Sequence, residues 1–219
     1  MIDKMNVFPI MGCWLDASNT LHLNLSNTNK ELVPSIFGDI HTFSNYISGE
    51  LKNSNKEYGI GGYLEQRNIY SLFINFVQDD SIQRNIHLGI DVWSKSGTSV
   101  YSPLDGIVHS FQLNHGDGNY GPTIILAHNM GGKIFHSLYG HLSTSDIQHL
   151  KVGMIISQGD LLCHLGESHE NGGWPPHLHF QLICDMQGWT GDYPGVSSKK
   201  DIEGYAKNCP NPISFLFKS

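Results

Sequence analysis

This sequence of 219 residues has no long hydrophobic run and no cluster of basic residues. No stretch approaches the roughly 18 apolar residues of a membrane-spanning helix, so we expect no transmembrane segment. Lys and Arg number 13 against 20 Asp and Glu, which gives a net charge of -7 at pH 7 when histidine is neutral. This balance offers no basic surface for nucleic acid or for an anionic membrane, and we expect neither as a partner.

Cysteine is also scarce, and its spacing excludes zinc ribbons and redox motifs built on C-x-x-C pairs. The four cysteines are widely separated, at positions 13, 163, 184 and 209. Free thiols fit a reducing compartment, and the sequence leaves open whether any of them pair. The N-terminal residues carry no convincing export signal, because Asn6 and Pro9 interrupt a short apolar run. We expect a cytoplasmic protein, with export by an unconventional route as the alternative, and the oligomeric state is left open.

Strands and turns dominate the expected structure. Twenty-four glycines and 11% aromatic residues predict many short strands joined by turns. Leucines alternate with polar residues over 20–25, which predicts a strand, and the β-branched and aromatic content of 70–77 predicts a buried one. Helices are predicted over about 35–50 and, briefly, over 143–150. We expect an N-terminal extension over 1–85 and a second domain with a C-terminal tail over 86–219.

The first motif of interest is His87-Leu88-Gly89-Ile90-Asp91-Val92. Its aliphatic residues alternate with His87, Gly89 and Asp91, which predicts one strand with the imidazole and the carboxylate on the same face. Gly89 would leave a gap between those two side chains. Such a gap could admit a metal ion.

Two further motifs show the same alternation. In residues 177–182, His177 and His179 share one face while leucine and phenylalanine occupy the other. In residues 138–142, Tyr139 and His141 are expected to share a face. Each motif alone would arise easily by chance among thirteen histidines. Three of them in strand alternation predict one site.

The residue types in these motifs favour zinc. One carboxylate and two neutral imidazoles suit Zn²⁺ and leave a fourth tetrahedral position for water, as catalytic zinc sites require.

In this order the motifs H-x-x-x-D, Y-x-H-L and H-L-H-F resemble those of lysostaphin/LytM-type zinc metalloendopeptidases, over about residues 86–185. The resemblance implies an all-β fold, mainly an antiparallel sheet or sandwich, with one Zn²⁺ per chain on His87, Asp91 and His179. It also implies that His141 and His177 flank the water as general base and electrostatic partner, and that Tyr139 donates a hydrogen bond to the developing oxyanion. The implied substrates are peptides or peptidoglycan fragments that contain glycine or D-amino acids.

Some segments depart from the usual pattern of that family. Gln181 stands where an acidic residue is usual, which affects the surroundings of a ligand rather than a ligand itself. Residues 120–126, 170–176 and 187–195 look more like a peptidase-type domain that some bacterial proteins fuse to kinase-like and aminotransferase domains. A domain of that kind would act inside the cell.

Several alternatives stay open from the sequence. The 1–85 segment either packs on the second domain or covers its metal, with Asn19, Asn24 and Asn27 as candidate blocking ligands. Packing is favoured because the apolar face of the helix needs a partner. A non-catalytic or regulatory peptide-binding module is the alternative function. A histidine phosphocarrier is disfavoured because Asp91 would repel phosphate.

Overall fold

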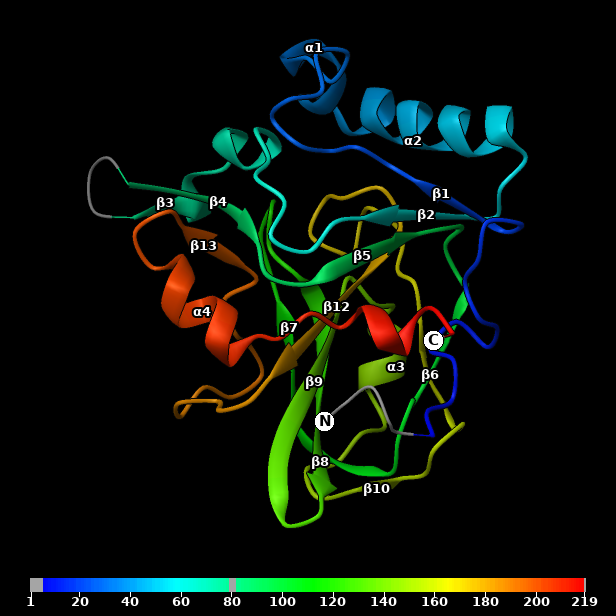
Figure 1. Ribbon diagram of the computed structural model, residues 1–219, viewed down its shortest axis with the longest axis vertical. Coiled ribbons are helices and arrows are strands. Elements are labelled where there is room, and N and C mark those ends of the chain that lie inside the picture. Colours follow the sequence, from blue (N-terminus) through cyan, green and yellow to red (C-terminus); the bar gives the residue numbers. More distant parts are fainter. Residues whose placement is uncertain (1–5, 79–81, 219) are drawn as a thin grey trace.

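The computed structural model describes residues 6–78 and 82–218 (Figure 1). Its centre is an eight-stranded sheet in the order β1-β2-β5-β12-β9-β8-β7-β10. The pairs are antiparallel except β1 with β2, and two small sheets, β11-β6 and β13-β4-β3, flank this one. The predicted all-β class, mainly antiparallel, is confirmed. The strands of the described residues are β1 (Thr20–His22), β2 (Tyr58–Gly61), β3 (Val77–Gln78), β4 (Ile82–His87), β5 (Ile90–Trp93), β6 (Ser99–Tyr101), β7 (Gly106–Asn114), β8 (Gly121–Met130), β9 (Lys133–Gly140), β10 (Ile155–Ile156), β11 (Leu161–His164), β12 (His177–Ile183) and β13 (Val196–Ser198).

Helices are few and short, apart from one that lies along the sheet edge formed by β1 and β2 (Figure 1). No helix of the described residues is both long and apolar enough to cross a membrane. The predicted short helix near 143–150 is confirmed as α3. The helices are α1 (Pro34–Phe37), α2 (Ile40–Ser54), α3 (Thr144–Ile147) and α4 (Ile202–Asn208), with 3-10 turns η2 (Ile69–Leu72), η3 (Ile74–Phe76) and η5 (Ile213–Phe215).

Strand β12 lies between β5 and β9 and carries the pattern expected of it. Leu178, Phe180 and Leu182 point into the main hydrophobic core. His177 and His179 therefore project from the opposite face of the sheet, as the alternation predicts. The central strand thus separates the core from the candidate site.

The predicted single strand over 87–92 is wrong. Strand β4 ends at His87 and β5 begins at Ile90, so the chain turns a corner at Leu88 and Gly89. Leu88 is fully buried, but it packs in a cluster apart from the one that holds Ile90. At Gly89 a Cβ atom would lie 2.7 Å from the carbonyl oxygen of Phe180 and 2.8 Å from the ring of His179. The ring of His179 therefore packs directly against the backbone at Gly89, and there is no open gap at this residue.

The N-terminal segment is joined to the sheet through β2, which pairs with β5. The helix predicted over 35–50 is present as α1 and α2, which are separated at Gly38. Helix α2 buries Phe43 and Ile47 in a second core with Trp93 and Trp174.

The strand predicted over 70–77 is wrong, because this segment forms the 3-10 turns η2 and η3. Its aromatic residues Tyr70, Phe73 and Phe76 recur every third position, which matches the 3-10 repeat rather than the two-residue repeat of a strand. Their rings contact one another and Trp174, with centroids 4.7 to 6.3 Å apart. This aromatic segment forms one wall of the candidate site.

Candidate metal centre

Four histidines and one aspartate meet on the face of the sheet opposite the main core. They come from β4 (His87), β5 (Asp91), β12 (His177 and His179) and the residue that follows β9 (His141). All five are at most 5% exposed. The structure therefore brings together the three predicted ligands and both predicted catalytic histidines.

The three predicted ligands place their donor atoms around one point. His87 Nε2 lies 2.9 Å from His179 Nδ1, and Asp91 Oδ1 lies 3.2 Å from each of these nitrogens. One donor atom from each residue falls within 4.8 Å of the others. Among the described residues, this is the group of His, Cys, Asp and Glu side chains that is close enough to hold an ion.

Hydrogen bonds on the outer side of the two ligand histidines determine their tautomers. His87 Nδ1 lies 3.0 Å from the carbonyl oxygen of Gly62, and His179 Nε2 lies 2.9 Å from Oε1 of Gln181. Because these oxygens only accept, the ring nitrogens facing them carry the protons. The inner nitrogens, His87 Nε2 and His179 Nδ1, therefore present lone pairs to the same point, as metal ligation requires.

His141 and His177 are held in the same way. His141 Nδ1 donates to the carbonyl oxygen of Asn171 at 2.8 Å, and His177 Nδ1 donates to that of Pro175 at 2.8 Å. Both Nε2 atoms are left as acceptors. His177 Nε2 lies 3.9 Å from Asp91 Oδ1, and the rings of His141 and His177 stack with centroids 4.1 Å apart.

His141 reaches this place through an unusual backbone conformation. Its φ is +64°, in the left-handed region that side-chain-bearing residues seldom adopt. The backbone N–H of His141 donates to the Tyr120 carbonyl, and together with the Asn171 bond this stabilises the strained turn. Such strain costs about 1–3 kcal/mol and persists where the surroundings determine the conformation.

Burial keeps His87, His141 and His177 neutral. It lowers the pKa of His87 and of His177 to about 4 in each case, and it lowers the pKa of His141 well below its usual value. Burial alone would raise the pKa of Asp91, but His87 and Arg67 hold it well below the usual range. At neutral pH the centre therefore contains a charged carboxylate beside the neutral imidazoles of His87, His141 and His177.

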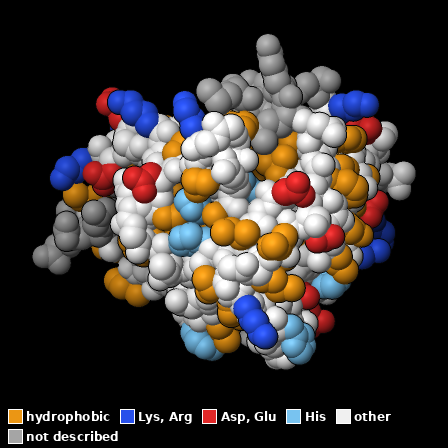
Figure 2. Space-filling model, turned by 90° about the horizontal axis from the view of Figure 1, so that it is seen from below, with side chains coloured by type: hydrophobic (Ala, Val, Ile, Leu, Met, Phe, Trp, Pro, Cys, Tyr) orange, Lys and Arg blue, Asp and Glu red, His pale blue; other side chains and the backbone are white. Residues whose placement is uncertain are grey.

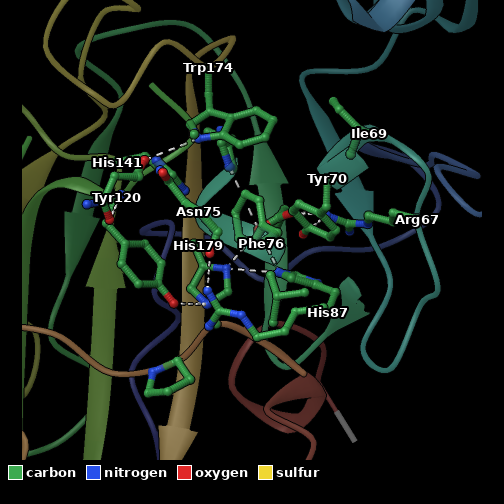
Figure 3. Close-up of a pocket in the computed structure, with 18 of the residues that line it drawn as sticks. Arg67, Ile69, Tyr70, Asn75, Phe76, His87, Tyr120, His141, Trp174 and His179 are labelled. Carbon is green, nitrogen blue, oxygen red and sulfur yellow. Dashed lines mark hydrogen bonds and ion pairs between the residues drawn. The ribbon is translucent and has the colours of Figure 1, made fainter. Parts of the chain in front are cut away.

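A cavity of about 250 Å³ opens beside these residues. Figure 3 shows Tyr120 and His141 on one side of His179, with Arg67, Tyr70 and His87 on the other. Phe76, Trp174 and Trp189 add further aromatic walls. In Figure 2 hydrophobic side chains gather in the middle of the visible face with histidines among them, and Lys and Arg are scattered around it.

The expectation that Tyr139 faces the site beside His141 is wrong. Tyr139 is fully buried in the main core, where its hydroxyl accepts a hydrogen bond from Ser137 and its ring lies 5.3 Å from that of Phe180. Since Tyr139 pairs with Phe180 across β9 and β12, the two share the core face. His141 reaches the other face because the strand ends at Gly140 and the chain turns.

A different phenol, Tyr120, occupies the site. Its hydroxyl lies 3.4 Å from His179 Nε2, and its ring lies 5.5 Å from the ring of His141. Glycine makes room for it, because a Cβ atom at Gly140 would meet the Tyr120 ring at 2.6 Å and one at Gly195 would meet its hydroxyl. The sequence carried one signal for this residue, its position between the turn at 116–119 and the start of β8.

The N-terminal segment reaches the centre, but not through the asparagines suggested as blocking ligands. Asn19 bonds Asp16 and Trp14, Asn24 bonds Ser26, and the backbone N–H of Asn27 donates to the carbonyl of Gln66. None of the three lines the cavity. Instead, Arg67 contacts Asp91 at 2.5 Å.

Comparison with known proteins gives one family match. Residues 85–189 match Peptidase family M23. Among curated proteins, no sequence matches that of this chain.

Three solved structures show similarity to part of the chain. A putative peptidase M23 from Pseudomonas aeruginosa is 22% identical, covering 59% of this chain and 43% of its own, with a TM-score of 0.40. A zinc-containing peptidase from Vibrio cholerae is 26% identical over 49% of this chain and 30% of its own, with a TM-score of 0.36. The catalytic domain of the antimicrobial peptidase lysostaphin from Staphylococcus simulans is 23% identical over 55% of this chain and 80% of its own, with a TM-score of 0.39. This chain spans less than half the length of the first two.

Proposed function

We propose that this chain is a zinc-dependent peptide-bond hydrolase, an endopeptidase for peptides that contain glycine or D-amino acids, such as peptidoglycan fragments. The observation that carries the proposal is the convergence of His87, Asp91 and His179 beside two further histidines whose Nε2 atoms are free to accept a proton. The match of residues 85–189 to a peptidase family supports the same reaction class.

The donor set and its charge fit zinc. Two neutral imidazole nitrogens and one carboxylate oxygen are the ligands of many catalytic zinc sites. Around them, two carboxylates, Asp91 and Glu65, face a single guanidinium, that of Arg67. With neutral histidines this buried group keeps one uncompensated negative charge, which a divalent cation would offset.

When bound, zinc would polarise the scissile carbonyl and lower the pKa of water. The residues of the chain supply the proton transfer. His177 and His141 both present an unprotonated Nε2, because their Nδ1 atoms donate to backbone carbonyls, and either is placed to accept a proton as a general base. Because the two rings stack 4.1 Å apart, protonation of one disfavours protonation of the other. One histidine would therefore act as base while its neighbour stays neutral.

Tyr120 is the donor in place of Tyr139. Burial raises the pKa of its phenol well above 10, so the hydroxyl keeps its proton at neutral pH. We propose that this hydroxyl donates to the oxygen of the scissile carbonyl as negative charge develops there.

The proposal is tested by release of soluble peptides from purified sacculi, both glycine-bridged and directly cross-linked. Wild type loaded with zinc is compared with the Asp91→Ala and His177→Ala variants and with a chelator-treated sample. We expect release by wild type only, with zinc lost from Asp91→Ala and retained by His177→Ala. Activity that survives His177→Ala, or zinc that survives Asp91→Ala, would refute the assignment of roles. A wild-type chain that binds zinc and releases no peptide from either kind of sacculus points instead to the binding-module alternative.

A further inference from the structure

Arg67 makes an ion-pair chain that ends on a predicted metal ligand. Its Nη1 lies 2.5 Å from Asp91 Oδ2, and its Nε lies 2.7 Å from Glu65 Oε2. The Arg67 side chain is 3% exposed, and Figure 3 shows it beside Tyr70, whose hydroxyl lies 3.2 Å from Nη1. A guanidinium is thus buried directly behind the carboxylate of the centre.

This arrangement is not expected to increase the free energy of unfolding. Arg67 Nη2 is buried and has no hydrogen-bond partner among the described residues. An unpartnered buried donor costs free energy, and buried ion pairs are often no more stable than apolar residues of the same volume. The position of Arg67 therefore calls for an explanation in terms of what it does to Asp91.

The two carboxylate oxygens of Asp91 have different partners. Oδ2 is taken by Arg67, whereas Oδ1 lies 3.2 Å from both His87 Nε2 and His179 Nδ1. Only Oδ1 is free to face the ring nitrogens. We propose that Arg67 is a positioning residue: by pairing with Oδ2, it leaves Asp91 only Oδ1 with which to bind the metal. The inference rests on the proposed metal centre, and it brings a residue of the N-terminal segment into that centre.

The loop around Arg67 is shaped for this contact. A Cβ atom on Gly61 would lie 2.6 Å from Arg67 Nη2, so a larger residue there would displace the guanidinium. The carbonyl oxygen of the next residue, Gly62, accepts a hydrogen bond from His87 Nδ1. Residues 61–67 thus orient two of the three predicted ligands, one by a hydrogen bond and one by an ion pair.

The experiment compares zinc affinity, by competition with a chromophoric chelator, in wild type, Arg67→Lys and Arg67→Gln. Lysine keeps the charge but cannot bridge Glu65 and Asp91 as a planar guanidinium does. If Arg67 positions Asp91, both variants lose zinc affinity by about 10- to 100-fold. If only its charge mattered, Arg67→Gln would bind zinc more tightly and Arg67→Lys would be unchanged, and that result overturns the inference.

The visible absorption spectrum of bound Co²⁺ gives a second readout, which a purely structural role of Arg67 would not move. In both Arg67 variants we expect weaker absorption per ion, because the freed carboxylate can contribute its second oxygen and raise the coordination number. An unchanged cobalt spectrum in a folded variant would also overturn the inference.

Gly61→Ala keeps every charged group and provides the test of the inference if the Arg67 variants fail to fold. It should weaken zinc binding in the same direction, whereas Gly49→Ala, whose Cβ meets nothing within 4 Å, should not. Equal affinities in these two alanine variants contradict the inference. A wild-type chain that binds zinc but cleaves no peptide overturns the proposed function alone. A wild-type chain that binds no metal overturns the proposed function and the inference about Arg67.

Discussion

At the scale of single residues, the centre depends on which ring nitrogen of each histidine carries the proton. Four acceptors determine this, namely three backbone carbonyls and the Gln181 amide oxygen. Gln181 itself is held in place because its amide donates to the carbonyl of Pro194. An amide oxygen performs the orienting task that a carboxylate could perform there, without adding a second negative charge beside His179.

Two tyrosines provide a matched test of the proposed oxyanion donor. Tyr120→Phe should lower turnover by about 100-fold, the effect of losing one such donor, while zinc binding is retained. Tyr139→Phe should leave turnover unchanged and cost about 1 kcal/mol of unfolding free energy through the lost Ser137 bond. Steady-state rates and denaturant unfolding of both variants check this prediction. Equal turnover of Tyr120→Phe and wild type would remove Tyr120 from the mechanism.

His136 should make stability depend on pH, far from the metal centre. Burial, with His109 nearby, lowers its pKa to about 4, whereas the unfolded chain takes up the proton near pH 6.5. Its contribution is therefore complete above pH 6.5 and is lost as pH falls toward 4, by up to about 1.4 kcal/mol per pH unit.

Urea unfolding of metal-free wild type and of His136→Gln, between pH 4 and 8, measures this contribution. We expect the stability of the variant to fall less steeply over the acidic half of this range. His149→Gln, at an exposed position, should keep the wild-type slope. Parallel curves for His136→Gln and wild type would contradict the prediction.

The residues of the centre were predictable because their types and spacing carry chemical information. His87, Asp91, His141, His177 and His179 do meet as predicted from the three motifs. The acceptors behind them were not predictable, since a backbone carbonyl such as that of Gly62 leaves no mark in the sequence. Arg67 was missed for another reason, as it lies 24 positions before Asp91 and has no periodic relation to it.

At the scale of elements, the corner between β4 and β5 sets the distance between His87 and Asp91. Alternation alone predicted one strand, because Leu88, Ile90 and Val92 are aliphatic residues at every second position. All three are indeed buried. Alternation cannot tell which core each aliphatic side chain enters, and Leu88 enters a different one. Similarly, the apolar content of residues 70–77 predicted a strand, although the aromatic residues in it repeat every third position and form 3-10 turns.

Gly89→Ala tests how far this corner depends on close approach. The added Cβ would meet the Phe180 carbonyl and the His179 ring, and both residues belong to the central strand β12, whose backbone has little freedom to move away. We expect a loss of about 1–3 kcal/mol in unfolding free energy, the usual cost of overpacking, together with weaker zinc binding. Thermal unfolding with and without zinc measures both effects. Gly204→Ala, where a Cβ meets nothing within 4 Å, is the control, and equal zinc affinity in the two variants would count against the argument.

At the scale of the whole molecule, the segment before residue 85 and the rest of the chain are joined by a continuous stack of rings. Phe43 of α2 packs edge-on against Trp93 at 5.7 Å, Trp93 stacks on His177 at 4.0 Å, and His177 stacks on His141. Together with the pairing of β2 and β5, this stack connects helix α2 to the proposed catalytic histidines. A removable propeptide would be expected to make a more separable interface than this one.

We therefore predict that the chain unfolds as one cooperative unit, and Phe43→Ala tests this. Phe43 is 2% exposed, and truncation of a buried phenylalanine costs about 3–5 kcal/mol. If the N-terminal segment is integral, the variant shows a single transition at lower temperature, with circular dichroism and tryptophan fluorescence in agreement, and its turnover falls because Trp93 no longer supports His177. Ile74→Ala, at a side chain 81% exposed, should leave the unfolding temperature and the turnover unchanged. Two separate transitions, or turnover that rises when α2 is loosened, would show instead that residues 1–85 act as a cover that restrains the site.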